Sequence, residues 1–257
     1  MEKNEYIPQL ENQSKHEQFL QIVKSVDTVI IKIDYARALA NKGIDANTYA
    51  GEERTVITTT TIMDEKLEDL SWIEELNIVE KFNPDYHIAV DCPTYQEHSK
   101  SERMYNLRLY LQGLIFMEQN LRNVQVIPLI KGETKEERNF AKQVYDHYNY
   151  GYAVFYVTQY LSVGERHYKV IQKINQIANE FSDKKIIVMG LQAPRYVKKY
   201  ASNVIAVSGQ KWLKVADPNK NSEQQIIENY GNLASNIQEA LRDQTQKSLF
   251  EYEEASA

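Results

Sequence analysis

The chain has 257 residues, of which 42% are hydrophobic and 26% charged, and its formal net charge is −6. This is ordinary globular composition with enough apolar material for a sizeable core, and the length suits one large α/β domain better than two small ones. The single cysteine, Cys92, excludes a disulfide framework or a cysteine zinc cluster within one chain, and no apolar run approaches the roughly 20 residues that span a bilayer.

The amino-terminal residues 1–20 are polar and lack the apolar region of a signal peptide, so we expect a cytoplasmic protein with no membrane contact. We expect this segment and the acidic tail 245–257 to be peripheral or frayed parts of a single domain that spans 1–257. Strand-like runs follow at 27–34 and 54–63, with helices predicted at 35–42 and 66–83.

From about residue 80 onward, strand-like and helix-like segments alternate. Short apolar runs predict strands at 86–91, 124–132, 151–157, 184–190 and 203–209. Helical spacing fills the segments between and after them, at 101–122, 134–148, 164–181, 193–202 and 222–242. Continuous apolar strands are typical of parallel sheets covered on both faces. About seven such units favour an α/β fold, a TIM-like (β/α)8 parallel barrel, complete or imperfect, with an open doubly wound sheet as the alternative.

Ligands bind at the carboxyl ends of the strands in either architecture. The polar residues expected there include Asp91, Lys131, Gly132, Gln192 and Ser208. Asp91 has two open interpretations: it binds a ligand's N–H groups or acts as acid or base, or it caps the loop that follows. Lys131 is either a ligand contact or a solvated loop lysine. Asp34 is expected to cap the helix that begins at Tyr35.

The five histidines show no metal-ligand spacing, and glycine-rich phosphate loops are absent from the sequence. We therefore expect neither a metal nor a cofactor. His87, inside a predicted strand, is interpreted as a packed core residue or a surface residue.

The segment from Lys184 to Lys214 contains no Asp or Glu. Its candidate phosphate-contacting cations are Arg195, Lys198, Lys199, Lys211 and Lys214. The alternative is a solvated face balanced by nearby acids such as Glu165 or Asp183. Tyr196 and Trp212 lie among these charges and either stack on bases or belong to the core.

Several segments resemble the tRNA-guanine transglycosylase family. "GYAV" (151–154) and "LSVGE" (161–165) resemble its Gly-Tyr-Ala-Ile-Gly-Gly-Leu-Ser-Val-Gly-Glu signature. "VDCPTY" (90–95) resembles its Leu-Asp-Glu-Cys-Thr-Pro stretch, and "VIPLIKGETKEER" (126–138) resembles its Gln-Gly-Gly turn and following helix. The match in order covers roughly 54–216. The chain is most similar to reduced members of the kind that place 7-deazaguanines in DNA.

The resemblance implies roles for individual residues. Asp91 matches the family's base-binding aspartate, Glu165 the glutamate that ends the signature, and Gly132 the glycine after a base-contacting glutamine. That glutamine is Lys131 here. The family's early aspartate becomes about Thr58, the nucleophilic aspartate becomes about Ser208, and the zinc cluster is absent. Asp34 and Asp217 are the nearest carboxylates that would substitute for the nucleophile.

Three functions follow as hypotheses. The first is a transglycosylase-like protein that exchanges or recognises a guanine or 7-deazaguanine base in DNA or tRNA, with Asp91 and Ser208 as catalytic candidates and Lys131, Gly132, Glu165 and Gln192 as substrate contacts. The second is a non-catalytic barrel that binds nucleic acid or a partner protein. The third is an unrelated barrel enzyme that holds a phosphate-bearing small molecule near Ser208 and Gly209. The oligomeric state is open, with a homodimer among the alternatives.

Overall fold

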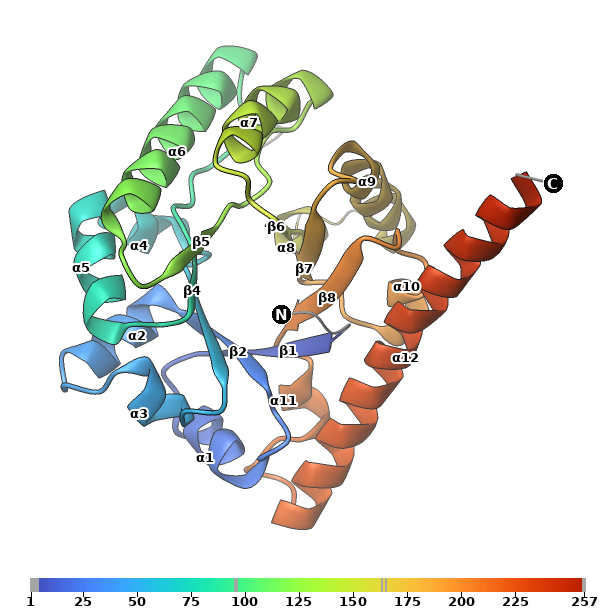
Figure 1. The fold of residues 1–257 in the computed structure, drawn as a ribbon. Helices are drawn as coiled ribbons and strands as arrows, with labels where there is room; N and C mark the ends of the chain where they lie inside the picture. The colour runs from blue at the N-terminus through green and yellow to red at the C-terminus, as the bar shows by residue number, and fades with distance from the viewer. Residues whose placement is uncertain (1–4, 95–96, 163, 165, 256–257) are drawn as a thin grey trace. The chain divides into compact units, whose positions relative to one another are not determined.

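The computed structural model describes residues 5–94, 97–162, 164 and 166–255. Eight strands are present, and the helices follow them in alternation (Figure 1). The strands are β1 (Glu5–Leu10), β2 (Thr28–Lys32), β3 (Thr55–Thr59), β4 (Tyr86–Ile88), β5 (Gln125–Ile127), β6 (Tyr152–Tyr156), β7 (Lys185–Met189) and β8 (Val204–Gly209). The helices are α1 (Ser14–Ile22), α2 (Ile33–Ala40), α3 (Ala46–Ala50), α4 (Asp64–Glu68), α5 (Trp72–Phe82), α6 (Lys100–Asn120), α7 (Lys135–His147), α8 (Thr158–Ser162), α9 (His167–Glu180), α10 (Pro194–Val197), α11 (Trp212–Val215) and α12 (Glu223–Ala255).

The strands pair in the order β5-β4-β3-β2-β1-β8-β7-β6. The described pairings are parallel, and a parallel bridge from Leu129 to Val154 joins the segment after β5 to β6. The fold class is therefore α/β, a TIM-like (β/α)8 parallel barrel, as the sequence predicts.

The chain divides into two compact units. The first contains Met1–Gln9, Gln13–Val26 and Phe155–Ala257, and the second contains Leu10–Asn12 and Asp27–Val154. The expectation that the chain forms a single domain stays a prediction.

The expectation that residues 1–20 are peripheral is wrong for the part of them that the structure describes. Residues 5–10 form β1, which pairs in parallel with β8, and Ile7 and Leu10 are fully buried. Pro8 and the polar neighbours hid this strand from the sequence pattern, because proline is uncommon in paired strands. β1 is also why the structure has eight strands where the sequence predicts about seven.

Aromatic side chains build the core of the first unit. The indole of Trp212 is fully buried and stacks on Phe19 of α1 with ring centroids 4.0 Å apart. Tyr230 of α12 meets Phe19 edge to face at 5.1 Å. Trp212 is thus a core residue and is not available to stack on bases.

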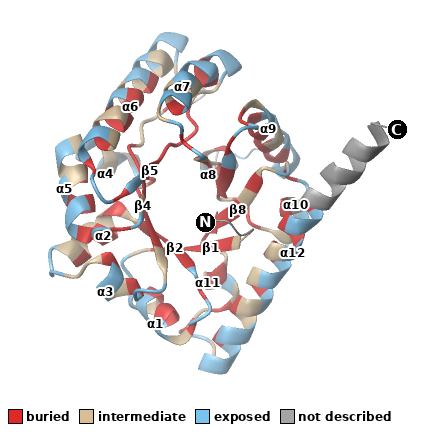
Figure 2. Cartoon of the chain, viewed as in Figure 1, coloured by how far each residue is buried: buried red, intermediate tan, exposed pale blue. Residues whose placement is uncertain are grey.

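The core of the second unit combines apolar strands with buried tyrosines. The apolar residues of β2 and β3 from Val29 to Ile31 and at Val56 and Ile57 are fully buried, and Figure 2 shows buried positions concentrated on the strands. The hydroxyls of Tyr110 and Tyr145 both donate to the carbonyl oxygen of Leu129, at 2.8 and 2.6 Å. These bonds satisfy a buried backbone group just beyond β5 and fix the segment that leads to Lys131.

Candidate functional site

Asp91 and Lys131 form an ion pair just beyond the carboxyl ends of β4 and β5. The Lys131 ammonium also donates to the carbonyl oxygen of Cys92 at 2.8 Å, and the Cys92 N–H donates to Asp91 Oδ1 at 2.8 Å. Both side chains are largely buried, with 12% of Asp91 and 9% of Lys131 exposed. The pair neutralises two charges that would be costly to bury separately. Lys131 is therefore not a solvated loop lysine.

Asp91 retains one carboxylate oxygen for a further contact. Oδ1 receives both the Lys131 ammonium and the Cys92 N–H. Within the described part of the chain, no hydrogen bond or ion pair engages Oδ2. A carboxylate has about four lone-pair directions, so Oδ2 is free to accept two N–H donors from a ligand.

A strained backbone leads into Asp91. Val90 has φ 46°, in the left-handed region that is unfavourable for a β-branched residue. Its N–H donates to Glu75 Oε1 of α5 at 2.9 Å. A conformation that costs about 1–3 kcal/mol persists only where the surroundings over-determine it. Glu75 therefore holds the turn that aims Asp91.

Glu75 is oriented in turn by a series of hydrogen bonds between buried side chains. Its Oε1 contacts His87 Nε2 at 2.8 Å, and His87 Nδ1 contacts Thr58 Oγ1 at 2.8 Å. All three side chains are at most 2% exposed. Of the two interpretations of His87, the structure shows the core residue, and Thr58 acts here as its hydrogen-bond partner.

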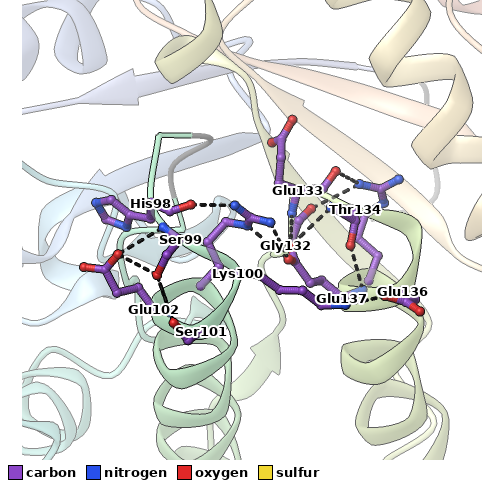
Figure 3. Close-up of polar contacts among 12 residues, drawn as sticks. His98, Ser99, Lys100, Ser101, Glu102, Gly132, Glu133, Thr134, Glu136 and Glu137 are labelled. Carbon is purple, nitrogen blue, oxygen red and sulfur yellow. Dashed lines mark hydrogen bonds and ion pairs between the residues drawn. The ribbon is translucent and has the colours of Figure 1, made fainter.

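The loop that carries Lys131 is fixed by the start of α7. Glu137 Oε2 accepts from the N–H groups of Glu133 and Thr134 at 2.7 and 3.2 Å, and Arg138 donates to the carbonyl oxygens of Gly132 and Glu133 (Figure 3). Gly132 has φ 109°, and a Cβ there would lie 2.8 Å from Glu137 Cβ. The site thus needs glycine at position 132 for close packing, whatever the ligand.

An ion pair links this loop to α6. Arg103 contacts Glu137 Oε1 through Nε and Nη2, both at 3.0 Å, and also donates to the carbonyl oxygen of His98. Burial raises the pKa of Glu137, but the hydrogen bonds from Arg103, Thr134 and Glu133 outweigh it and lower the pKa below its usual value. Figure 3 shows these contacts between the amino-terminal turns of α6 and α7.

Cys92 is a buried thiol beside the ion pair. Its Sγ donates to the carbonyl oxygen of Asn106 at 3.2 Å. Burial, opposed by Lys131 and reinforced by Asp91, raises the pKa of Cys92 to about 12. The neutral thiol is a poor nucleophile at neutral pH.

Ser208 and Gln192 belong to the first unit. Ser208 is the fifth residue of β8, and its Oγ is buried without a hydrogen-bond partner in the described residues. A hydroxyl with no base beside it is a weak nucleophile. Gln192 accepts from Tyr6 Oη and from the Lys211 N–H, both at 3.1 Å, and donates to the Gly190 carbonyl oxygen at 2.8 Å. Its amide thus joins the segments that follow β7 and β8.

The candidate phosphate contacts also lie in the first unit, on segments 190–203 and 210–216. Across the residues that the structure describes, no carboxylate pairs with Arg195, Lys198, Lys199, Lys211 or Lys214. Asp183, suggested above as a balancing acid, pairs with Lys184, the first cation of the segment, at 3.1 Å. Glu165 lies outside the described residues.

Asp34 and Asp217 are each engaged by neighbouring groups, and the suggestion that one of them substitutes for the nucleophile stays a prediction. Asp34 lies in the first turn of α2, whose N-cap is Lys32, and it pairs with Lys66 at 2.6 Å. The expectation that Asp34 caps a helix beginning at Tyr35 is wrong, because α2 begins two residues earlier at Ile33. Asp217 accepts from the Asn219 N–H within its own turn.

A cavity of about 320 Å³ in the second unit lies away from this site. Its lining includes Tyr86, Gln125 and Tyr152, the first residues of β4, β5 and β6. Asp91 and Lys131 follow the opposite ends of these strands. Among the described residues, no group of three or more His, Cys, Asp or Glu is placed to hold a metal ion, and no helix has the length and apolar character to cross a bilayer.

Four residues that matter here were missed as site residues: Glu75, Arg103, Glu137 and Arg138. The sequence shows only one local signal for them, the Thr134 to Glu137 capping box, which the structure contains. The partners Arg103 and Glu137 lie 34 residues apart in the chain, so no local pattern joins them. Comparison with protein-family models and with curated protein sequences finds no match for this chain.

Proposed function

We propose that this chain recognises a guanine-like base, guanine or a 7-deazaguanine, in DNA or tRNA, with Asp91 as the carboxylate that reads the base. The single observation that carries the proposal is the carboxylate of Asp91, whose Oδ1 is held by Lys131 and Cys92 while Oδ2 has no partner among the described residues. Guanine offers adjacent N–H donors at its ring nitrogen and exocyclic amine, which suit a carboxylate.

Lys131 supports this role electrostatically. A ligand that covers Asp91 removes it from water, and an unpaired carboxylate would then be strongly disfavoured. The ion pair with Lys131 already balances the charge of Asp91 before the ligand binds, so the loss of water costs less. The resemblance to the transglycosylases supports the same assignment, because Asp91 matches their base-binding aspartate.

Recognition is better supported than base exchange. Exchange needs a nucleophile for the sugar's anomeric carbon, and the Ser208 hydroxyl has no base within hydrogen-bonding distance in the described residues. Exchange would thus need another carboxylate.

The test measures binding of guanine, 7-cyano-7-deazaguanine and hypoxanthine by calorimetry. Hypoxanthine lacks the exocyclic amine, so wild-type protein should bind it about tenfold or more weakly, since a hydrogen bond to a charged group contributes about 1.5–3 kcal/mol. Asp91→Asn should abolish this preference, and Asp69→Asn, at an exposed aspartate, should keep it. Absence of guanine binding, or a preference that survives Asp91→Asn, would reject the proposal.

Exchange is measured in parallel with radiolabelled guanine on DNA and tRNA. Incorporation by wild-type protein and not by Asp91→Asn would extend the proposal to an enzyme, a glycosyltransferase of the base-exchange type. Binding without incorporation is the expected result.

A second function, non-catalytic nucleic-acid binding, is favoured by the cations of the first unit for which the described residues supply no carboxylate partner. Lysine and arginine side chains that contact phosphates release counterions, so binding should weaken steeply as salt rises. Replacing Lys198 and Lys199 by alanine should flatten the dependence of log affinity on log salt by about two units, roughly one per lost phosphate contact. Lys142→Ala, at a lysine already paired with Asp146, is the matched control. Equal salt slopes in all three proteins would remove this function.

A further inference from the structure

Two polar side chains near the end of β8, two positions apart in the chain, carry buried atoms without partners in the part of the chain that the structure describes. Ser208 Oγ and Gln210 Nε2 are both buried and have no hydrogen-bond partner among the described residues. Ser208 is 0% exposed. Buried polar groups are nearly always hydrogen-bonded in native proteins, so these two donors call for a partner that the described side chains do not supply.

The strand register shows which side of the sheet Ser208 faces. β1 and β8 pair with Tyr6 beside Val207 and Ile7 beside Ser208. Tyr6 approaches Tyr230 of α12, with ring centroids 6.2 Å apart, so its side of the sheet is the helix-covered one. Because side chains alternate along a strand, Ser208 points to the opposite, inner side.

The turn after Ser208 is held in place by Gln192. The Gln192 amide accepts from the Lys211 N–H and donates to the Gly190 carbonyl oxygen, so it ties the turn to the segment after β7. Gly209 has φ 155°, and a Cβ there would lie 1.7 Å from Gln192 Nε2. The turn from Ser208 to Lys211 is therefore preorganised, which reduces the entropy lost when a ligand binds.

Three cations lie close to one another beside this turn. Burial lowers the pKa of Lys211, and the neighbouring charges of Arg195 and Lys214 lower it further. The Arg195 guanidinium lies 4.7 Å from the centre of the Tyr196 ring and donates to its hydroxyl at 2.9 Å. Like charges held together without a carboxylate partner are relieved by an anion.

We propose that the turn from Ser208 to Lys211, with Arg195 and Lys214, binds a phosphate group. The Ser208 hydroxyl and the Gln210 amide supply neutral donors, and the cations supply charge. The phosphate belongs either to a nucleic-acid backbone or to a free nucleotide. The nucleic-acid source rests on the proposed nucleic-acid binding, whereas the subsite itself requires nothing from Asp91.

The test uses calorimetry with inorganic phosphate, guanosine 5′-monophosphate, guanosine and a single-stranded DNA oligonucleotide. Wild-type protein should bind phosphate. Ser208→Ala and Lys211→Met should each weaken its binding about tenfold, because hydrogen bonds to charged groups are the strong ones. The controls are Ser202→Ala and Lys169→Met, both at exposed positions of the first unit.

The outcomes distinguish a free nucleotide from a nucleic-acid backbone, and they distinguish this phosphate subsite from the proposed base recognition by Asp91. Tighter binding of the monophosphate than of guanosine would show that the phosphate comes from a free nucleotide. Binding of the oligonucleotide with negligible binding of the monophosphate would show that it comes from a nucleic-acid backbone. Ser208→Ala should not lower the melting temperature, because no described residue is a hydrogen-bond partner of the lost hydroxyl. Phosphate and oligonucleotide affinities that are absent, or unchanged in both variants, would overturn the subsite. Asp91→Asn should leave phosphate binding intact, so failure of base recognition is distinguishable from failure of this inference.

Discussion

Replacing Gly132 by alanine should destabilise the protein by about 3 kcal/mol. Holding a non-glycine residue at φ 109° costs about 1–3 kcal/mol. The added methyl would lie 2.8 Å from Glu137 Cβ and 3.0 Å from the Arg138 nitrogen, which are not flexible chain ends, and such overpacking costs about 1–3 kcal/mol. Any shift of α7 that relieves the contact weakens the Glu137 bonds to Glu133 and Thr134.

The assay is urea denaturation at neutral pH, followed by fluorescence. Gly151→Ala is the matched control, because a Cβ at Gly151 meets nothing within 4 Å and no positive φ opposes it. That variant should be neutral or stabilised by up to about 1 kcal/mol, through loss of unfolded-state freedom. A Gly132→Ala protein within about 0.5 kcal/mol of wild type, the usual range for surface changes, would refute the reasoning about this loop.

Three further predictions concern the groups around the site. Thr58→Val should lower the free energy of unfolding by about 1–3 kcal/mol, because it leaves a buried His87 nitrogen without its partner. Calorimetric unfolding measures this, and an unchanged free energy of unfolding would contradict the role of the Thr58–His87 hydrogen bond. Iodoacetamide should alkylate Cys92 on the order of 1,000-fold more slowly than a free cysteine at pH 8, given a thiol pKa of about 12, and faster in Asp91→Asn because the carboxylate raises that pKa. The folded-state pKa of Glu137 is lowered, so its carboxylate stabilises the fold above the unfolded value of about 4.3 and loses this effect as pH falls through the folded value. Glu137→Gln should therefore be less stable than wild type at pH 7 by about 2 kcal/mol and closer to it at pH 3, and equal differences at both pH values would count against the ion pair.

The helices and strands after residue 80 were predictable because their signals are local. A buried parallel strand is a continuous apolar run, and a surface helix repeats its apolar residues at helical spacing. The capping box at Thr134 and Glu137 was also readable, since its two hydrogen bonds join residues three apart. β1 escaped because Pro8 and its polar neighbours hide the apolar pattern, although pairing with β8 buries Ile7 completely.

The candidate site was only partly predictable. The sequence placed Asp91 and Lys131 after neighbouring strands, and the parallel pairing of β4 with β5 brings them into contact. It did not reveal that Glu75 holds Val90.

Local composition and periodicity were thus enough to predict the alternating α/β architecture, because the apolar pattern that marks each helix or strand is carried by residues close together in the chain. The partners of the charged side chains depended on packing between distant segments. Arg103 meets Glu137, and Lys131 meets Asp91, although more than 30 residues of chain separate the members of each pair. A charge buried by such packing needs a compensating partner, and only the assembled fold determines which side chain supplies it.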